Sequence, residues 1–164
     1  MAFLLRVVSN PKWVAPDWMA VGDVPADALT DLRAENNALS LWSVEVDLSN
    51  LHTAVAAVAS NRVRLDKLDY ALLDEAVLPE IPIKHVRSEG NTPHPAANAS
   101  LHRDLVELTV QKVADLAGRM MPLKRVRVTQ RQVEDLLKTA LKNGVIDRAR
   151  ISPKLLSELE STSA

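Results

Sequence analysis

Alternating apolar and polar positions predict two β-strands near the start of the chain. The run FLLRVV at 3–8 is short, apolar and β-branched at its end, and SNP follows it, as is typical of a buried strand. In LSLWSVEVD at 39–47, Trp42, Val44 and Val46 fall on one face, and the residues between them fall on the other. We therefore expect both segments in a sheet.

Helical spacing predicts two helices in the first half of the chain. One begins near Pro25, since proline is tolerated in a first turn, and the other lies in LSNLHTAVAAVASN, where Asp47 or Ser49 supplies a cap. Residues 65–78 fit either a helical stripe or a central strand, and we favour the strand because strand, helix, strand and helix precede it. The prolines of LPEIPI argue against regular structure after that segment.

The second half has a mainly helical pattern. Apolar residues at helical spacing from Leu101 to Met120 predict one long amphipathic helix. KRVRV at 124–128 alternates and predicts a short strand or an extended link. Another helix follows, with a capping box formed by Thr129 and Gln132, and SPKLLSELE supplies a last short helix.

These elements predict an α+β fold with a boundary in the middle of the chain. The stretch RSEGNTPHPAANAS has the glycine, proline and asparagine content of a linker or exposed loop. We expect a small mixed sheet of about three strands with two helices at 1–88. We expect the linker or loop at 89–99, followed by a helical C-terminal part of about three helices at 100–164.

Composition and charge narrow the class of protein. Residues 1–100 carry 8 basic and 13 acidic side chains, whereas residues 101–164 carry 12 and 8, so the two halves are complementary in charge. The chain has no cysteine, which excludes disulfides, thiolate nucleophiles and cysteine-ligated metals.

The N-terminal run lacks the features of a signal peptide, and no segment approaches the roughly 20 apolar residues of a membrane helix. We expect a cytoplasmic protein without a membrane partner.

The chain contains no recognisable active site. Motifs of serine hydrolases, phosphate-binding loops and dinucleotide sites are absent from the sequence, and its histidines lack the HxxxH and HExxH spacings of zinc sites. One cluster of carboxylates is more typical of a solvated face than of an acid–base pair: Asp66, Asp69, Asp74 and Glu75. We expect no cofactor and no metal, and we favour a protein that is not an enzyme. An enzyme of unrecognised type would use these carboxylates, or His94 and His102.

TVQKVADLAG at 109–118 resembles the first helix and the turn-entry glycine of the helix-turn-helix in lac-repressor-like regulators. The resemblance implies a second helix that reads DNA. In this chain, however, Arg119 follows the glycine, and later buried positions of the motif fall on Lys124 and Arg127, where charges would lose their solvent. Pro122 also makes the following residues poor helix material. The residues therefore argue against a helix-turn-helix.

Nucleic-acid binding by another route remains the alternative function. Five basic side chains lie within thirteen residues that include no acidic one: Arg119, Lys124, Arg125, Arg127 and Arg131. Such a stretch attracts phosphate, although no aromatic residue follows Tyr70 to stack on bases. The same arginines would otherwise face water or the acidic first half.

Two tryptophans in a proline-bearing loop, Trp13 and Trp18, are the candidate partner-binding residues. A tryptophan in such a loop either fills the edge of the core or anchors a partner. Because the chain lacks active-site motifs and carries opposite charges in its halves, we favour a small protein-interaction or regulatory protein without catalytic activity. Its partner would be another protein or a second copy of itself.

Overall fold

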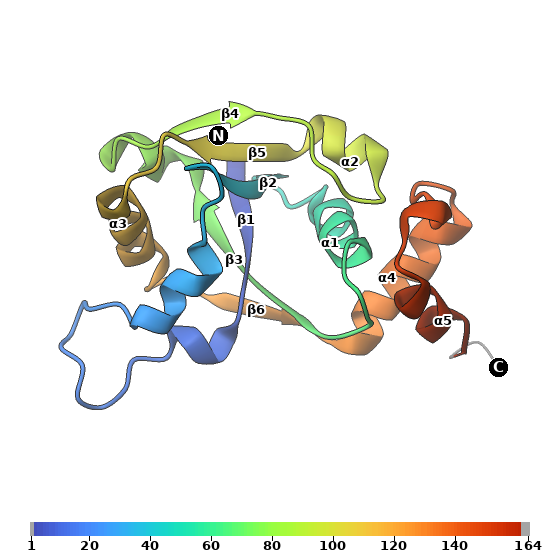
Figure 1. The fold of residues 1–164 in the computed structure, drawn as a ribbon, viewed down its shortest axis with the longest axis horizontal. Helices are drawn as coiled ribbons and strands as arrows, with labels where there is room; N and C mark the ends of the chain where they lie inside the picture. The colour runs from blue at the N-terminus through green and yellow to red at the C-terminus, as the bar shows by residue number, and fades with distance from the viewer. Residues whose placement is uncertain (1, 162–164) are drawn as a thin grey trace.

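The apolar N-terminal run forms a central strand of a six-stranded sheet. In this computed structural model, which describes residues 2–161, the strands follow the order β4-β5-β2-β1-β3-β6, and all neighbours are antiparallel. The strands are β1 (Ala2–Val8), β2 (Leu39–Glu45), β3 (Leu68–Asp74), β4 (Lys84–Arg87), β5 (His102–Val106) and β6 (Arg125–Val128). Figure 1 shows the sheet between two groups of helices.

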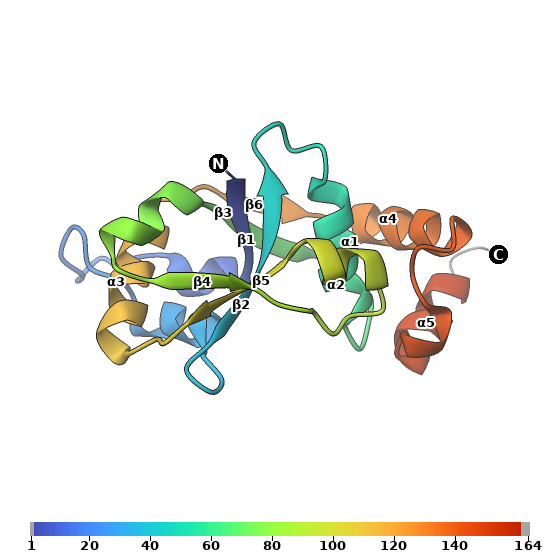
Figure 2. The ribbon, with the colours of Figure 1, turned by 90° about the horizontal axis from the view of Figure 1, so that it is seen from above.

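Helices cover both faces of the sheet. The α-helices are α1 (Leu51–Ser60), α2 (Pro95–Ser100), α3 (Val110–Met120), α4 (Gln130–Lys142) and α5 (Pro153–Ser161). Short 3₁₀ helices are η1 (Asn10–Trp13), η2 (Ala26–Leu32), η3 (Glu75–Glu80) and η4 (Arg148–Arg150). Figures 1 and 2 place α3 on one side of the strands and α1, α4 and α5 on the other.

The core has two layers because successive residues of a strand point to opposite faces. Leu5 and Val44 pack in one layer with residues of α1, α4 and α5. Leu4 and Leu41 pack in the other with residues of η2 and α3. The central strands are therefore apolar on both faces.

The expectation of a sheet with about three strands and a purely helical C-terminal part is wrong. The sheet has six strands, and two of them, β5 and β6, come from the part expected to be helical. β4 was missed because two prolines precede it. Within residues 2–161, β4 is an edge strand that pairs only with β5. Prolines are tolerated beside an edge strand, because one side of it forms no hydrogen bonds within the sheet.

The single long helix expected from Leu101 to Met120 is also wrong. Residues His102–Val106 form β5, which pairs with β2 so that Leu105 lies opposite Leu39 in the core. The helix begins only at Val110, after Glu107 takes a positive φ of 57°. A spacing of four residues between leucines suits a helix, but strand pairing over a distance of more than sixty residues decides the conformation here.

Other predicted elements are confirmed. Strands cover 3–8 and most of 39–47, the ambiguous segment is the strand β3, and 125–128 is the edge strand β6. α4 begins with the predicted capping box of Thr129 and Gln132. After α3 the chain turns into β6 instead of a second helix, as the argument against a helix-turn-helix requires.

Buried polar groups order the segment between β4 and β5. Asn98 accepts hydrogen bonds from the backbone N–H and the hydroxyl of Thr92 and donates to the Thr92 carbonyl. His102 Nδ1 lies 2.8 Å from the Ser88 hydroxyl oxygen. A β-carbon on Gly90 would lie 2.9 Å from the Asn98 Oδ1 atom, so the close approach requires glycine there. The segment predicted as a linker or loop therefore contains a specific polar cluster.

Candidate partner-binding site

The loop of residues 14–24 projects from the body of the protein. It connects η1 to η2 and extends beyond the other elements at the end of the molecule opposite α5 (Figures 1 and 2). Three of its apolar side chains are exposed: Val14, Trp18 and Val21. Trp18 is 82% exposed, which is unusual for the residue type with the most apolar surface to bury.

Asp31 fixes the base of this loop. Its carboxylate accepts hydrogen bonds from the backbone N–H of Ser9 at 2.6 Å and from Trp13 Nε1 at 2.9 Å, and it pairs with Lys12 Nζ at 3.1 Å. Trp13 is 1% exposed and belongs to the core. The structure thus separates the two candidate tryptophans: Trp13 anchors the loop from inside, and Trp18 is presented to solvent.

Two turns shape the loop between these ends. The backbone N–H of Met19 donates to the Pro16 carbonyl at 2.9 Å, so Trp18 occupies the third position of a four-residue turn. The N–H of Asp23 donates to the Ala20 carbonyl, and Gly22 adopts a φ of 94°. The tryptophan therefore lies at the tip of a turn and not along an extended strand.

The sequence segment that carries Trp18 is acidic. The segment 13–32 contains no lysine, arginine or histidine. Asp17, Asp23 and Asp27 are exposed there, whereas Asp31 is engaged at the base of the loop. The site combines an exposed aromatic ring with carboxylates that no neighbouring base in the segment neutralises.

The basic stretch is largely engaged within the molecule. Arg127 donates from Nε and Nη2 to the two carboxylate oxygens of Asp69, at 2.8 and 2.9 Å. These hydrogen bonds hold the pKa of Asp69 below its ordinary value and the pKa of Arg127 above its own. Asp69 lies on β3, in the acidic first half, so this pair joins the two halves.

Two other arginines of the stretch also have partners. Arg119 pairs with Glu80 at 3.1 Å. Arg125 donates to the Met121 carbonyl and lies 6.0 Å from the ring centre of Trp13. For the remaining two members, Lys124 and Arg131, residues 2–161 provide no ion pair.

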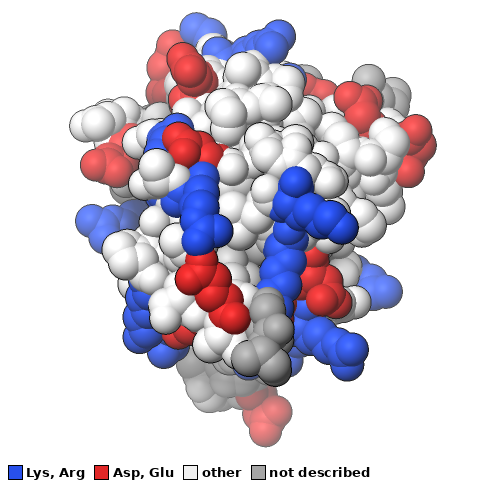
Figure 3. All heavy atoms as spheres, turned by 90° about the vertical axis from the view of Figure 1, so that its right-hand side faces the viewer, with Lys and Arg blue, Asp and Glu red and all other residues white. Residues whose placement is uncertain are grey.

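On the end of the molecule formed by α4 and α5, charged side chains of both signs occur. Figure 3 shows basic and acidic side chains interspersed on the end of the molecule formed by α4 and α5, with no extended area of one sign. Two ion pairs contribute to this pattern: Lys138 with Glu134, and Arg148 with Glu160. This face therefore lacks the concentrated positive field that a phosphate backbone needs.

The four carboxylates do not share one cleft. Asp66 and Asp69 line a cleft of about 350 Å³ beside basic side chains such as Arg62, whereas Asp74 and Glu75 are not part of it. Asp69 is held by its arginine, Asp74 accepts a hydrogen bond from the Ala76 N–H at the start of η3, and Glu75 pairs with His85 at 2.7 Å. Within the described part of the chain, no group of three or more histidine and carboxylate side chains could hold a metal ion. The cluster instead stabilises local structure.

Sequence reasoning missed part of this site. It selected the two tryptophans but not the exposed valines beside Trp18 or the absence of bases around them. That absence was visible as the twenty-residue run of 13–32 without a basic residue.

No helix among residues 2–161 has the length and apolar character needed to cross a bilayer. No protein-family model, curated protein or solved structure matches the chain.

Proposed function

We propose that this protein binds another protein through loop 14–24, with Trp18 as the anchor. The observation that carries the proposal is the 82% exposure of Trp18 at the tip of a turn whose base is fixed in the core. A preformed loop loses little conformational freedom on binding, and large aromatic rings dominate binding energy at interfaces. The proposal does not involve catalysis.

The surroundings of Trp18 specify the chemistry of the partner. The exposed carboxylates of Asp17, Asp23 and Asp27 belong to the same segment as Trp18, so the partner is expected to offer an apolar pocket bordered by lysine or arginine. Burying a tryptophan removes about 150–250 Å² of surface from water, or roughly 4–6 kcal/mol before the costs of association. This is enough for one residue to decide whether a complex forms.

A second copy of the chain is a weaker candidate for this loop. In a two-fold symmetric contact in which the two loops meet at the symmetry axis, the carboxylates of both loops would come together. Like charges placed opposite each other at an interface cost free energy. We therefore propose a different protein with basic character.

Nucleic-acid binding is supported less well than protein binding. Three of the five basic side chains in the stretch 119–131 are occupied by partners within the molecule. Phosphate would have to compete with Asp69 for Arg127 and with Glu80 for Arg119. This alternative predicts binding that nuclease removes.

The test is capture from lysate of the native host with matched variants of the tagged protein, each with and without nuclease. The wild type is expected to retain a basic protein in both arms, and raised salt is expected to release it. Trp18→Ala should lose that protein. Val63→Ala, which shortens an exposed apolar side chain far from the loop in sequence, should retain it.

Three results would contradict the proposal. The first is equal retention of every captured protein by Trp18→Ala and wild type. The second is loss of the bound material with nuclease, which would favour the stretch 119–131. The third is loss of the captured protein from Val63→Ala and Trp18→Ala alike, which would indicate a general effect of surface truncation.

A further inference from the structure

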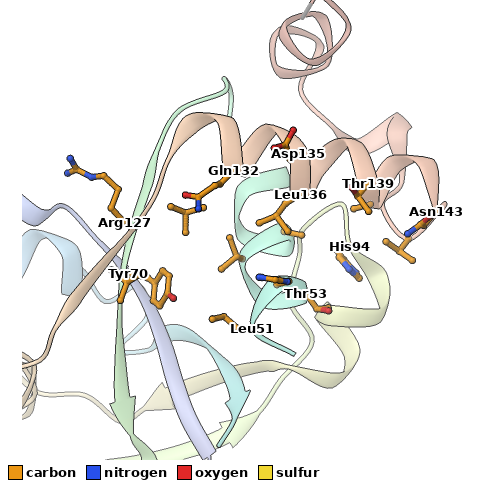
Figure 4. A pocket seen from close by; sticks show the side chains of 17 residues that line it. Leu51, Thr53, Tyr70, His94, Arg127, Gln132, Asp135, Leu136, Thr139 and Asn143 are labelled. Carbon is orange, nitrogen blue, oxygen red and sulfur yellow. The ribbon is translucent and has the colours of Figure 1, made fainter. Parts of the chain in front are cut away.

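A cavity of about 590 Å³ lies between α1 and α4, beside β3 and β6 (Figure 4). Small-molecule sites span roughly 300–1,000 Å³, so the cavity has a suitable size. Its walls include the apolar side chains of Val55, Ala56, Leu136 and Ala140. Since Ala56 and Ala140 end at the β-carbon, the two helices leave space between them.

His94 presents a polar atom to this cavity from a buried position. The residue is 4% exposed and lines the cavity. Its Nδ1 accepts a hydrogen bond from the Ala97 N–H, so the neutral ring carries its proton on Nε2. Burial lowers the pKa of His94, which favours this neutral form. Among the described residues, none provides a partner for Nε2.

Tyr70 provides a second polar atom to the cavity. It is 5% exposed, lines the same cavity, and its hydroxyl has no hydrogen-bond partner within residues 2–161. Burial raises the pKa of the phenol, so the hydroxyl keeps its proton. No side-chain oxygen or nitrogen of the described residues is both sealed from solvent and unpaired. The Tyr70 hydroxyl and His94 Nε2, which have no partner among residues 2–161, are therefore available to a molecule bound in the cavity.

The cavity has little charge to offer a ligand. Figure 4 shows the side chains of Arg127 and Asp135 directed away from the cavity. Arg127 is also committed to Asp69. Tyr70 and His94 lie on opposite sides of Leu136 in the same view, so they approach the cavity from different sides. An anion would find no free arginine or lysine among the side chains that line this space.

We propose that this cavity binds an uncharged, elongated and mainly apolar small molecule with hydrogen-bond acceptors that Tyr70 and His94 engage at its two ends. The apolar walls supply most of the binding energy through burial of the ligand. The two polar groups fix its orientation, because a ligand that displaced solvent from either donor without accepting a hydrogen bond would leave that donor unpaired, which costs free energy. This site is separate from the loop that carries Trp18.

The probe for the test is Nile red, an uncharged, elongated dye with a ring carbonyl. Its emission should shift to the blue in a saturable titration with one site per chain. Thr139→Trp, which fills the cavity from its exposed rim, should abolish that site. Ser157→Trp, an equally large change at an exposed position on α5, should leave it unchanged. Tyr70→Phe removes only the hydroxyl and should weaken binding about five-fold.

The remaining arms of the experiment identify the location and the charge of the ligand. Trp18→Ala should bind Nile red as the wild type does, since its site is elsewhere. The anionic dye anilinonaphthalene sulfonate should show no saturable site that Thr139→Trp removes. The proposal is overturned if Nile red does not saturate, if Thr139→Trp retains the site, or if the anionic dye occupies the cavity as tightly.

Discussion

Asn98→Ala tests the polar cluster that orders the chain between β4 and β5 and places His94. The Asn98 side chain makes three hydrogen bonds to Thr92, at 3.1, 2.7 and 2.8 Å, and both residues are buried. Alanine would leave the backbone N–H and carbonyl of Thr92 without these partners. The hydroxyl can rotate and still accepts from the His94 N–H.

The expected loss of stability follows from those two backbone groups. A buried donor or acceptor left unsatisfied costs about 1–3 kcal/mol, so the pair costs about 2–6 kcal/mol. Asn98 lies in α2, where alanine has the better helix propensity and returns about 0.5 kcal/mol. We expect the free energy of unfolding to fall by about 3 kcal/mol, which corresponds to a Tm lower by roughly 6–12 °C for a chain of this size.

Urea denaturation of wild type and Asn98→Ala measures this loss, with the m value compared to confirm that the same transition is observed. Asn61→Ala is the matched control, because Asn61 is exposed and the change should alter the free energy of unfolding by less than about 0.5 kcal/mol. A loss below about 1 kcal/mol for Asn98→Ala would refute the reasoning, since the Thr92 groups would then not depend on Asn98.

Other changes test separate parts of the structure. Trp18→Ala should change the free energy of unfolding by less than about 0.5 kcal/mol, because the side chain is exposed; thermal denaturation checks this. Gly90→Ala should cost about 1–3 kcal/mol in urea, because its β-carbon would lie 2.9 Å from Asn98 Oδ1. Because Arg127 lowers the pKa of Asp69 below 3.8, their pair stabilises the fold above that pH and loses effect as pH falls through the lowered pKa. The difference in unfolding free energy between wild type and Asp69→Asn should therefore shrink from about pH 5 to about pH 2; a constant difference would contradict the assignment.

The sequence pattern predicted the elements whose signals lie within a few neighbouring residues. The alternation in 39–47 identifies β2, and the capping box of Thr129 and Gln132 identifies the start of α4, because these signals act within a few residues. By contrast, Leu101 and Leu105 are spaced as in a helix. Pairing with β2 places the second of them in a strand, and that partner lies far away in sequence. Long-range pairing is therefore the information that the pattern lacked.

The candidate site also depends on both local sequence and long-range contacts. Trp13 and Trp18 occur in similar surroundings in PKWVAPDWM, and sequence alone gives no reason to separate them. Asp31 distinguishes them. This residue lies in η2, eighteen residues after Trp13, and its carboxylate accepts a hydrogen bond from the indole N–H of Trp13. The acidic character of the loop could be read from composition, but the exposure of one tryptophan required the fold.

We propose that Trp18 anchors a basic protein partner. The most direct measurement is the dissociation constant of the captured, purified partner with wild type, Trp18→Ala and Val63→Ala by calorimetry. We predict that Trp18→Ala weakens binding by about 30-fold or more, equivalent to a hot spot of at least about 2 kcal/mol, and that Val63→Ala matches the wild type. Equal dissociation constants for Trp18→Ala and wild type would contradict the account.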